Sequence, residues 1–266
     1  MINPLGETVD YNSAYNPALL FPILRTQGRA LIGIQQSLPF FGEDYWRAFE
    51  VSWLNQQGKP LVCMATFCFP CTTPFLIESK SFKLYLNSFN QQVFHSQDSV
   101  KKTLEQDLSQ ASGGRVSVDF ISLNAPVTLE SIAGILLDDL AITTDVYTVQ
   151  PDFLTTLGGQ VSETLSSHLL KSNCPVTGQP DWASVSIQYT GPKINREGLL
   201  KYIISFRHHD EFHEQCVERM FVDIMQRCRP SVLSVYARYT RRGGLDINPF
   251  RSSVDTRITH QRLVRQ

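Results

Sequence analysis

The chain has 266 residues, of which 42% are hydrophobic and 18% are charged, and its formal net charge is −1. These values are ordinary for a globular protein with room for one large or two small domains, and the charge argues against a protein that coats nucleic acid. No apolar run approaches the ~18 residues of a membrane-spanning helix, and the opening MINPLGETVD lacks the features of a signal peptide. We therefore expect a cytoplasmic protein without a membrane partner, whose six cysteines stay as thiols.

Five elements are predicted in the first half of the chain, in the order strand, strand, helix, helix, strand. They cover residues 46–54, 61–69 and 78–89, a helix that Ser96 caps, and residues 115–123. Both early strands alternate β-branched and aromatic residues around the turn QQGKP. The helix after Ser96 carries Val100, Leu104 and Leu108 on one stripe, which is typical of a helix with one face in the core.

The second half is predicted to contain a strand, two helices and a strand. They cover residues 183–189 and 195–206, a helix that Asp210 caps, and residues 233–240. The last helix has an apolar stripe of Phe212, Cys216, Met220, Ile224 and Cys228. Because the two cysteines of this stripe face the core, we interpret them as structural residues.

The chain carries an internal repeat. Ser88–Phe89 recurs as Ser205–Phe206, and Ser117–Val118 recurs as Ser234–Val235, at one constant offset of 117 residues. Matches between the two stretches are sparse, but the offset holds over some thirty residues. A constant offset indicates two copies of one structural unit.

Each copy is expected to be an α+β unit in which two helices cover one face of an antiparallel sheet. The Pro- and Gly-containing stretch 150–159 separates the copies, so the expected domains are residues 1–155 and 156–266. Such sheets have open edges, and closing them into a barrel across copies or subunits would remove those edges.

The copies differ at the positions that could carry chemistry. Glu78 of the first copy falls on Asn195 of the second, and nothing in the first copy resembles Cys174. One site assembled from both halves would explain this difference. A first half that is kept only for packing would explain it equally well.

Cys174 is the candidate nucleophile. It lies in SNCPVTGQPDW, a polar loop between Pro- and Gly-containing turns, and not in an apolar stripe. A lone cysteine is more often structural than catalytic, so a structural role is the alternative, and the loop setting makes the two about equally supported. Attack on carbon requires the thiolate, which a nearby base would favour. Asp181 follows the turn GQP, which could fold it back toward Cys174, and burial would favour its neutral form as an acid. A plain turn residue is the alternative for Asp181.

His213 and Glu214 lie in the first turn of the last predicted helix, so both reach one ligand only if it approaches the helix end. The glutamate can accept two N–H bonds from the guanidine-like edge of a purine, although it could also be a first-turn acid that the helix dipole favours. His209, His213 and Cys216 have helical ligand spacing. However, Val217 stands where the HExxH motif needs its second histidine, so we expect no metal.

The chain contains no fingerprint of a phosphate-binding loop. RRGG at Arg241–Gly244 is the candidate anion grip, because arginine binds phosphate bidentately and glycine lets the backbone approach. Seven arginines lie between Arg238 and the C-terminus, and a solvated basic tail is the commoner meaning of such a stretch. Cys68 and Cys71 could bind a metal or form a redox pair, but there is no second pair and we interpret them as structural.

Several sequence motifs of the chain resemble those of one enzyme family. Five segments are similar to signature segments of the NADPH-dependent 7-cyano-7-deazaguanine reductases, the nitrile reductases of queuosine biosynthesis: ESKSFKLYLNSFN, HLLKSNC, QPDW, SFRHHDEFHEQCVER and SVYARYTRRGGLDINP. The likeness runs from about Phe41 to the C-terminus, and the two-copy layout is similar to the long, bimodular type. It implies tandem tunnelling-fold (T-fold) units that form a barrel on assembly, in a homodimer, with NADPH as cofactor, a 7-deazapurine substrate and no direct nucleic-acid partner.

The resemblance also implies a role for each candidate residue. By position, Cys174 would attack the nitrile carbon to form a covalent thioimide, and Asp181 would supply the proton to nitrogen. The substrate would be bound by Glu78, His213 and Glu214. The NADPH would be contacted by Ser79, Lys80, Ser81, Arg242 and Gly243.

Other functions stay open from the residues themselves. A Cys-His-Asp thiol hydrolase would use the same groups on a purine-like substrate and would bind no nicotinamide. A catalytically silent module that binds a purine or RNA would use the basic C-terminus, and its RNA binding would depend on salt. A metal-dependent cyclohydrolase is the third alternative.

Overall fold

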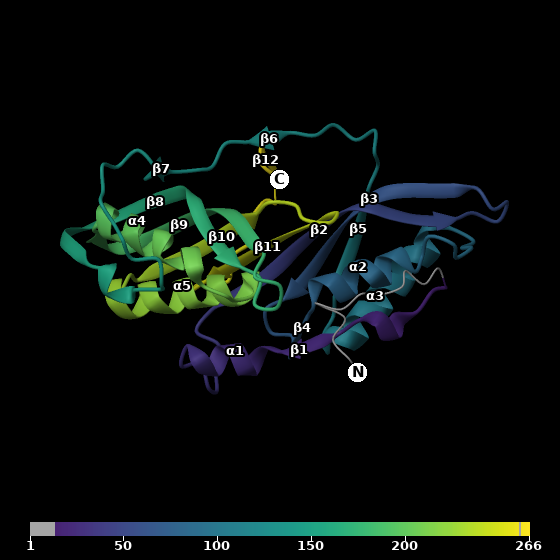
Figure 1. Cartoon of the computed structure of the whole chain (residues 1–266), viewed down its shortest axis with the longest axis horizontal. Coiled ribbons are helices and arrows are strands. Elements are labelled where there is room, and N and C mark those ends of the chain that lie inside the picture. The colour runs from purple at the N-terminus through teal and green to yellow at the C-terminus, as the bar shows by residue number, and fades with distance from the viewer. Residues whose placement is uncertain (1–13, 261) are drawn as a thin grey trace. The chain divides into compact units, whose positions relative to one another are not determined.

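A computed structural model describes residues 14–260 and 262–266 (Figure 1). The opening MINPLGETVD, in which we found no signal peptide, lies outside the described residues. The chain divides into two compact units. The first unit comprises residues up to 28, residues 44–127 and 241–246, and the second comprises 29–43, 128–240 and 247–266. The expected repeat boundary between residues 155 and 156 stays a prediction.

The first unit packs two helices on a sheet. Its elements are η1 (Pro17–Leu19), β1 (Pro22–Leu24), β2 (Phe41–Leu54), β3 (Pro60–Pro70), β4 (Phe75–Ile77), α2 (Ser79–Asn87), α3 (Gln97–Ser112) and β5 (Ser117–Ile121). Strands β5, β3 and β2 lie side by side in this order, and β1 pairs with β4. Phe82 of α2 meets Trp46 of β2 and Phe67 of β3 edge-on, with ring centroids 5.3 and 5.1 Å away, and so joins the helix to the sheet.

The second unit has the same layers. Its elements are β6 (Leu129–Glu130), β7 (Ile135–Leu136), η2 (Pro151–Phe153), β8 (Thr156–Asn173), β9 (Pro180–Ile194), α4 (Arg196–Ser205), η3 (Phe206–His208), α5 (His213–Cys228), β10 (Val232–Tyr239) and β12 (Arg262–Leu263). Two further elements, α1 (Arg25–Leu31) and β11 (Leu245–Ser252), contain residues of both units, and so does β2, whose first three residues belong to the second unit. Strands β11, β10, β9, β8 and β7 are neighbours in this order. Helices α4 and α5 lie on one side of β8–β10, and the chain near β6 runs along the other side, whereas β7 extends the sheet beyond β8 (Figure 1).

The strand order of each unit confirms the predicted pattern of strands and paired helices. The first unit runs β2-β3-α2-α3-β5 with the spatial order β5-β3-β2, and the second runs β8-β9-α4-α5-β10 with the order β10-β9-β8. In both, the strand that follows the helices pairs antiparallel with the second strand. The protein is therefore α+β, as the alternation in the sequence predicts, and the assignment of the units to the T-fold stays a prediction.

The internal repeat also appears as equivalent contacts within the two units. Ser88 Oγ donates to Tyr85 O at 2.6 Å, and Ser205 Oγ donates to Tyr202 O at 2.6 Å, 117 residues later. Each tyrosine hydroxyl donates at 2.6 Å to an aspartate of the following helix. Burial and this aspartate raise the pKa of both phenols, which stay neutral donors. Tyr85 and Tyr202, which are also 117 residues apart, thus fasten α2 to α3 and α4 to α5.

One helix cap was predicted correctly and one was wrong. Ser96 caps α3 in a capping box with Ser99, and the predicted stripe of α3 is fully buried. Asp210 does not cap α5, because Phe212 holds that position and the Asp210 carboxylate accepts a bond from Asn173 Nδ2 at 3.0 Å. The Asp210 carboxylate is therefore bound by Asn173 at the end of β8 and does not cap the helix.

Within the described residues, no helix has both the length and the apolarity needed to cross a membrane.

Strand β8 was not predicted. It covers 18 residues from Thr156 to Asn173 and includes part of the stretch that we took as a separator. Serine, threonine and glycine dominate this segment, so alternation of apolar residues does not reveal it. It becomes a strand through its pairing with β9, which runs along most of its length with two register irregularities.

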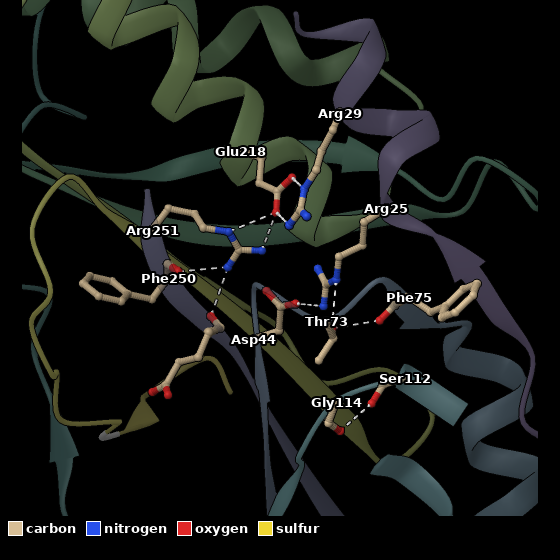
Figure 2. A network of polar contacts seen from close by, with 11 residues as sticks. Arg25, Arg29, Asp44, Thr73, Phe75, Ser112, Gly114, Glu218, Phe250 and Arg251 are labelled. Carbon is tan, nitrogen blue, oxygen red and sulfur yellow. Dashed lines mark hydrogen bonds and ion pairs between the residues drawn. The ribbon is translucent and has the colours of Figure 1, made fainter. Parts of the chain in front are cut away.

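The C-terminal arginines are only partly solvated: Arg241, Arg257 and Arg265 are exposed, whereas Arg238 and Arg251 are buried, which corrects that interpretation for these two. Arg251 is fully buried, and its guanidinium binds Glu218, which also binds Arg29 (Figure 2). Arg238 is 5% exposed. In the first unit, Arg25 forms a separate buried pair with Asp44, 2.6 Å away. Arginine in this sequence therefore serves packing as well as the surface, a distinction that charge counting cannot make.

Candidate active site

Cys174 lies in the turn between β8 and β9, in the second unit. Its N–H donates to Gln179 O at 2.9 Å, and Gly178 N–H donates back to Cys174 O at 3.0 Å. This confirms that the turn folds back, and it places Asp181 opposite Ser172 in the β8–β9 register. The turn itself is exposed, but Cys174 is only 6% exposed. A nucleophile at this position would be shielded from bulk water, as a reactive covalent intermediate requires.

Asp181 and His213 face each other beside this turn. Asp181 Oδ2 lies 3.3 Å from His213 Nε2, and both side chains are largely buried. The two atoms are not aligned for a hydrogen bond, and Nε2 has no other hydrogen-bond partner among the described residues. A buried imidazole nitrogen in this state is ready to bond a ligand or to exchange a proton with the neighbouring carboxyl.

The ring of Tyr239 packs against the imidazole of His213. This residue was not predicted from the sequence. Its ring lies 3.9 Å from the His213 ring, centroid to centroid, at an interplanar angle of 33°. Burial, and after it the nearby Cys216, raise the pKa of the Tyr239 phenol well above its usual value. Tyr239 is thus a neutral flat support that fixes the plane of His213. The alternating residues of β10 predict that this side chain points inward but not what it touches.

Glu214 follows His213 in the first turn of α5 and is 3% exposed, so it is directed into the protein. The nearby Glu211 has another task. Its carboxylate accepts two bonds from Arg219, at 2.8 and 3.0 Å, and lies 2.9 Å from His209 Nε2. Burial favours a higher pKa for Glu211, but these bonds outweigh it and lower the pKa. His209 is therefore engaged by Glu211, and no group of three metal-binding side chains occurs among the described residues.

Glu78 caps helix α2 in the first unit. Its two carboxylate oxygens accept bonds from Lys80 N at 2.8 Å and Ser81 N at 2.7 Å, and the side chain is fully buried. Asn195, its predicted counterpart, caps α4 through bonds from Glu197 N and Gly198 N, which confirms the correspondence. The capping role was not predicted, although an acid directly before a helix is a known start signal. Each capping oxygen keeps a second lone pair for a further donor.

The residues that follow Glu78 differ in access. Ser79 and Lys80 are half-buried. Ser81 is fully buried, and its hydroxyl donates to Glu78 O at 2.7 Å and accepts from Phe21 N at 3.0 Å. Ser81 therefore holds the start of α2 in place, whereas its neighbours can reach a ligand.

The RRGG turn and helix α2 share a cavity of about 460 Å³ within the first unit. Its walls include Lys83, Glu50, Gly243 and Gly244. Both glycines have positive φ angles, of 60° and 78°, and a Cβ at Gly243 would come within 3.2 Å of Lys83 Nζ. The positive φ angles are the main reason for glycine here, because the end of the lysine side chain could move aside. The neighbouring Arg241 lies over the Phe49 ring, 4.3 Å from its centroid, and closes the turn from outside.

This cavity fits the phosphate-bearing part of a nicotinamide cofactor. Lys83 supplies a cation, the glycine turn supplies accessible backbone, and the Glu50 carboxylate can accept a bond from a sugar hydroxyl. Of the residues that the resemblance implied for NADPH, Gly243 lines this cavity, whereas Arg242 is not among its lining residues. Lys83 lines the cavity and was not predicted from the sequence. Its spacing of three residues from Lys80, on the same face of one helix, was the available signal.

Comparison with known proteins gives these sites a family. A family model described as "Nitrile reductase, 7-cyano-7-deazaguanine-reductase N-term" matches residues 11–120, and one described as "QueF-like protein" matches residues 180–257. A relative from Dechloromonas aromatica, named NADPH-dependent 7-cyano-7-deazaguanine reductase, is 58% identical over 95% of this chain and 91% of its own. The chain belongs to this family of reductases. Relatives of the same name from Bordetella avium and Hydrogenovibrio crunogenus are 57% and 56% identical, over 94% and 98% of this chain and 93% and 96% of theirs.

Membership makes the chain an NADPH-dependent oxidoreductase, as the resemblance implied. The first model spans Glu78 to Ser81, and the second spans Asp181, His213 and Glu214 but begins after Cys174. The relatives of full length cover that position as well. A solved structure of the archaeosine synthase QueF-Like in the apo form is 17% identical, with a TM-score of 0.32 over 38% of this chain and 99% of that chain, a likeness too low for any argument.

Proposed function

We propose that this protein reduces the nitrile of 7-cyano-7-deazaguanine to the aminomethyl group of 7-aminomethyl-7-deazaguanine, in the queuosine pathway of tRNA modification. The observation that carries this proposal is the site beside the Cys174 turn, where Asp181 Oδ2 lies 3.3 Å from His213 Nε2. The chain is also 58% identical to a relative that is named for this activity. Reduction of a nitrile to a primary amine takes four electrons, so two NADPH are consumed for each substrate.

Cys174 is proposed to begin the reaction. Its sulfur adds to the nitrile carbon, and Asp181 gives a proton to the nitrogen, so that the triple bond becomes the C=N bond of a covalent thioimide. This step replaces a poor acceptor of hydride by an imine-like carbon, which divides one difficult reaction into two easier ones. When bound, NADPH would supply one hydride to the thioimide carbon. The C–S bond would then break, so that Cys174 leaves as thiolate and an imine remains, and a second NADPH would supply the hydride that reduces this imine to the amine. The low exposure of Cys174 supports the proposal, because water would hydrolyse an exposed imine-like intermediate.

His213 and Glu214 are proposed to hold the substrate at the start of α5. A buried carboxylate can accept two N–H bonds from the amino-pyrimidinone edge of a deazaguanine. Glu78 is proposed to bind the substrate while it caps α2. Whether one site uses residues of both repeats stays a prediction.

The cofactor is proposed to contact Ser79, Lys80, Ser81, Arg242 and Gly243, with Lys83 added from the cavity. Because Ser81 is engaged inside the unit, we assign it the task of positioning α2. We also propose the tandem T-fold, a barrel formed on assembly of a homodimer, and a cytoplasmic location.

An intact-mass measurement with 7-cyano-7-deazaguanine, and without NADPH, tests the chemistry. We expect an added mass equal to the whole substrate. The adduct should be absent in Cys174→Ala, which should keep reversible substrate binding but lose turnover. Cys63→Ala is the matched control, because it removes another buried thiol and should leave the adduct in place.

Two outcomes would contradict the proposal. The first is the absence of an adduct while Cys174 can still be alkylated, and the second is reduction by Cys174→Ala within tenfold of the wild-type rate. An adduct that has gained water and lost ammonia relative to the whole substrate would favour the thiol hydrolase. Salt-dependent RNA binding that survives Cys174→Ala, without turnover in the wild type, would favour the binding module.

A further inference from the structure

A second polar cavity lies in the second unit, on the face of the β8–β9–β10 sheet that α4 and α5 leave uncovered (Figure 1). Its volume is about 420 Å³. The walls combine strand residues with the chain near β6 and residues 257–259. The proposed reaction does not use this cavity.

The strand register places polar side chains together on this face. Tyr236 is paired with Ser186 and Arg238 with Ser184, so each pair lies on one side of the sheet. The intervening residues, among them Val235 and Ala237, are fully buried on the helix-covered side. A sheet with one apolar face and one polar face normally shows the polar one to water, but here the chain covers it and encloses a cavity.

Arg238 is the charged group of the cavity. It is 5% exposed, and its Nε has no hydrogen-bond partner among the described residues. Its ion pair with Glu130 spans 3.8 Å, too long for a hydrogen bond. The guanidinium also lies over the Tyr236 ring, 5.1 Å from its centroid. Burial lowers the pKa of Arg238, although Tyr236 and Glu130 oppose this.

Ser186 presents a second unsatisfied group to the same cavity. Its Oγ is buried and has no hydrogen-bond partner in the described chain. Leaving a buried polar atom unbonded costs free energy, and a buried charge without a close partner costs more. One ligand with two acceptor oxygens would satisfy both groups.

We propose that this cavity is a binding site for a small oxyanion, either a carboxylate or a phosphate group. The Arg238 guanidinium and the Ser186 hydroxyl donate to its oxygens, since charge-assisted bonds from arginine are the strongest available contacts for such groups. Phe250, Ile258 and the Tyr236 ring form an apolar wall for the rest of the ligand. Arg238 and Tyr239 are neighbours in β10 and point to opposite faces, so this site is separate from His213.

Binding of two simple anions to the full-length protein tests the proposal. The probes are inorganic phosphate and benzoate, titrated by calorimetry in a buffer free of other oxyanions, with chloride keeping the ionic strength constant. We expect saturable binding of at least one probe. Saturation by phosphate alone assigns a phosphate group as the ligand, and saturation by benzoate alone assigns a carboxylate.

The variants locate the site. Arg238→Gln should weaken binding by about tenfold or more, and Ser186→Ala by about three- to tenfold, in line with the loss of a charged and a neutral hydrogen bond. Arg115→Gln removes an exposed arginine of the first unit and should bind as the wild type does. Cys174→Ala should also bind unchanged, which separates this site from the proposed reaction.

Two results would overturn the proposal: no saturable binding of either anion, which means that solvent alone fills the cavity, or wild-type affinity in Arg238→Gln. If Arg238→Gln does not fold, anion binding is measured in Ser186→Leu instead. The leucine side chain fills the cavity, and the Arg238 charge stays in place. Retained anion binding in Ser186→Leu would then place the anion elsewhere.

Discussion

Glu218 is the residue whose loss should destabilise the second unit most clearly. Its Oε1 accepts bonds from Arg29 Nη2 at 2.8 Å and from Arg251 at 2.8 and 3.1 Å, and its Oε2 accepts from Arg29 Nε at 2.9 Å (Figure 2). At most 8% of any of the three side chains is exposed. Glu218→Gln keeps the volume but removes the charge that two buried guanidinium groups share.

Removing one partner of a buried ion pair costs about 3–5 kcal/mol, because the remaining charge stays buried without compensation. Arg251 keeps bonds to Phe250 O and Glu43 O, so some of its donors stay satisfied. For a domain of this size, each kcal/mol lowers Tm by about 2–4 °C. We therefore expect Tm of Glu218→Gln to fall by roughly 6–20 °C.

Urea unfolding followed by circular dichroism, together with calorimetry, measures this loss. Asp152→Asn is the matched control, because it removes one charge of the exposed pair with Arg227 in the same unit. The control should change the free energy of unfolding by less than about 1 kcal/mol. If Glu218→Gln loses no more than the control, the network does not stabilise the fold and the reasoning is refuted.

Three further predictions concern the candidate site. Glu78→Ala and Asn195→Ala should each cost about 0.5–2 kcal/mol as lost helix caps, but only Glu78→Ala should weaken substrate binding in a calorimetric titration, and equal affinities would count against its substrate role. The pKa of Glu211 is lowered from its ordinary 4.5, so its contribution to stability is complete above that value and is lost as pH falls through the lower folded pKa; urea midpoints should drop more steeply with acid in wild type than in Glu211→Gln, and parallel profiles would argue otherwise. Burial raises the pKa of Cys63 to about 11, so iodoacetamide at pH 8 should modify Cys174 first in peptide mass spectra, and faster labelling of Cys63 would contradict the nucleophile assignment.

Local patterns in the sequence determined most of the elements of both units. The Ser96 cap and the apolar stripe of the helix after it depend on residues that are close in the sequence. The repeat at 117 residues depends on the likeness of two copies of one unit. A helix start needs its own side chain and the first free N–H groups, so a few residues are sufficient to specify it. Similarly, the sequence motifs around Cys174 and His213 resemble those of the reductase family, and this resemblance predicted the activity before the structure was known.

The tertiary structure alone decided which polar residues are buried together. Glu218 meets Arg29 across 189 positions of the chain, and β8 becomes a strand only when β9 pairs with it. In the same way, Lys83 approaches Gly243, and Tyr239 supports His213, through folding that no local pattern encodes. A buried charge needs a partner that can come from any distance along the chain, and sequence periodicity describes only the element in which the residue itself lies.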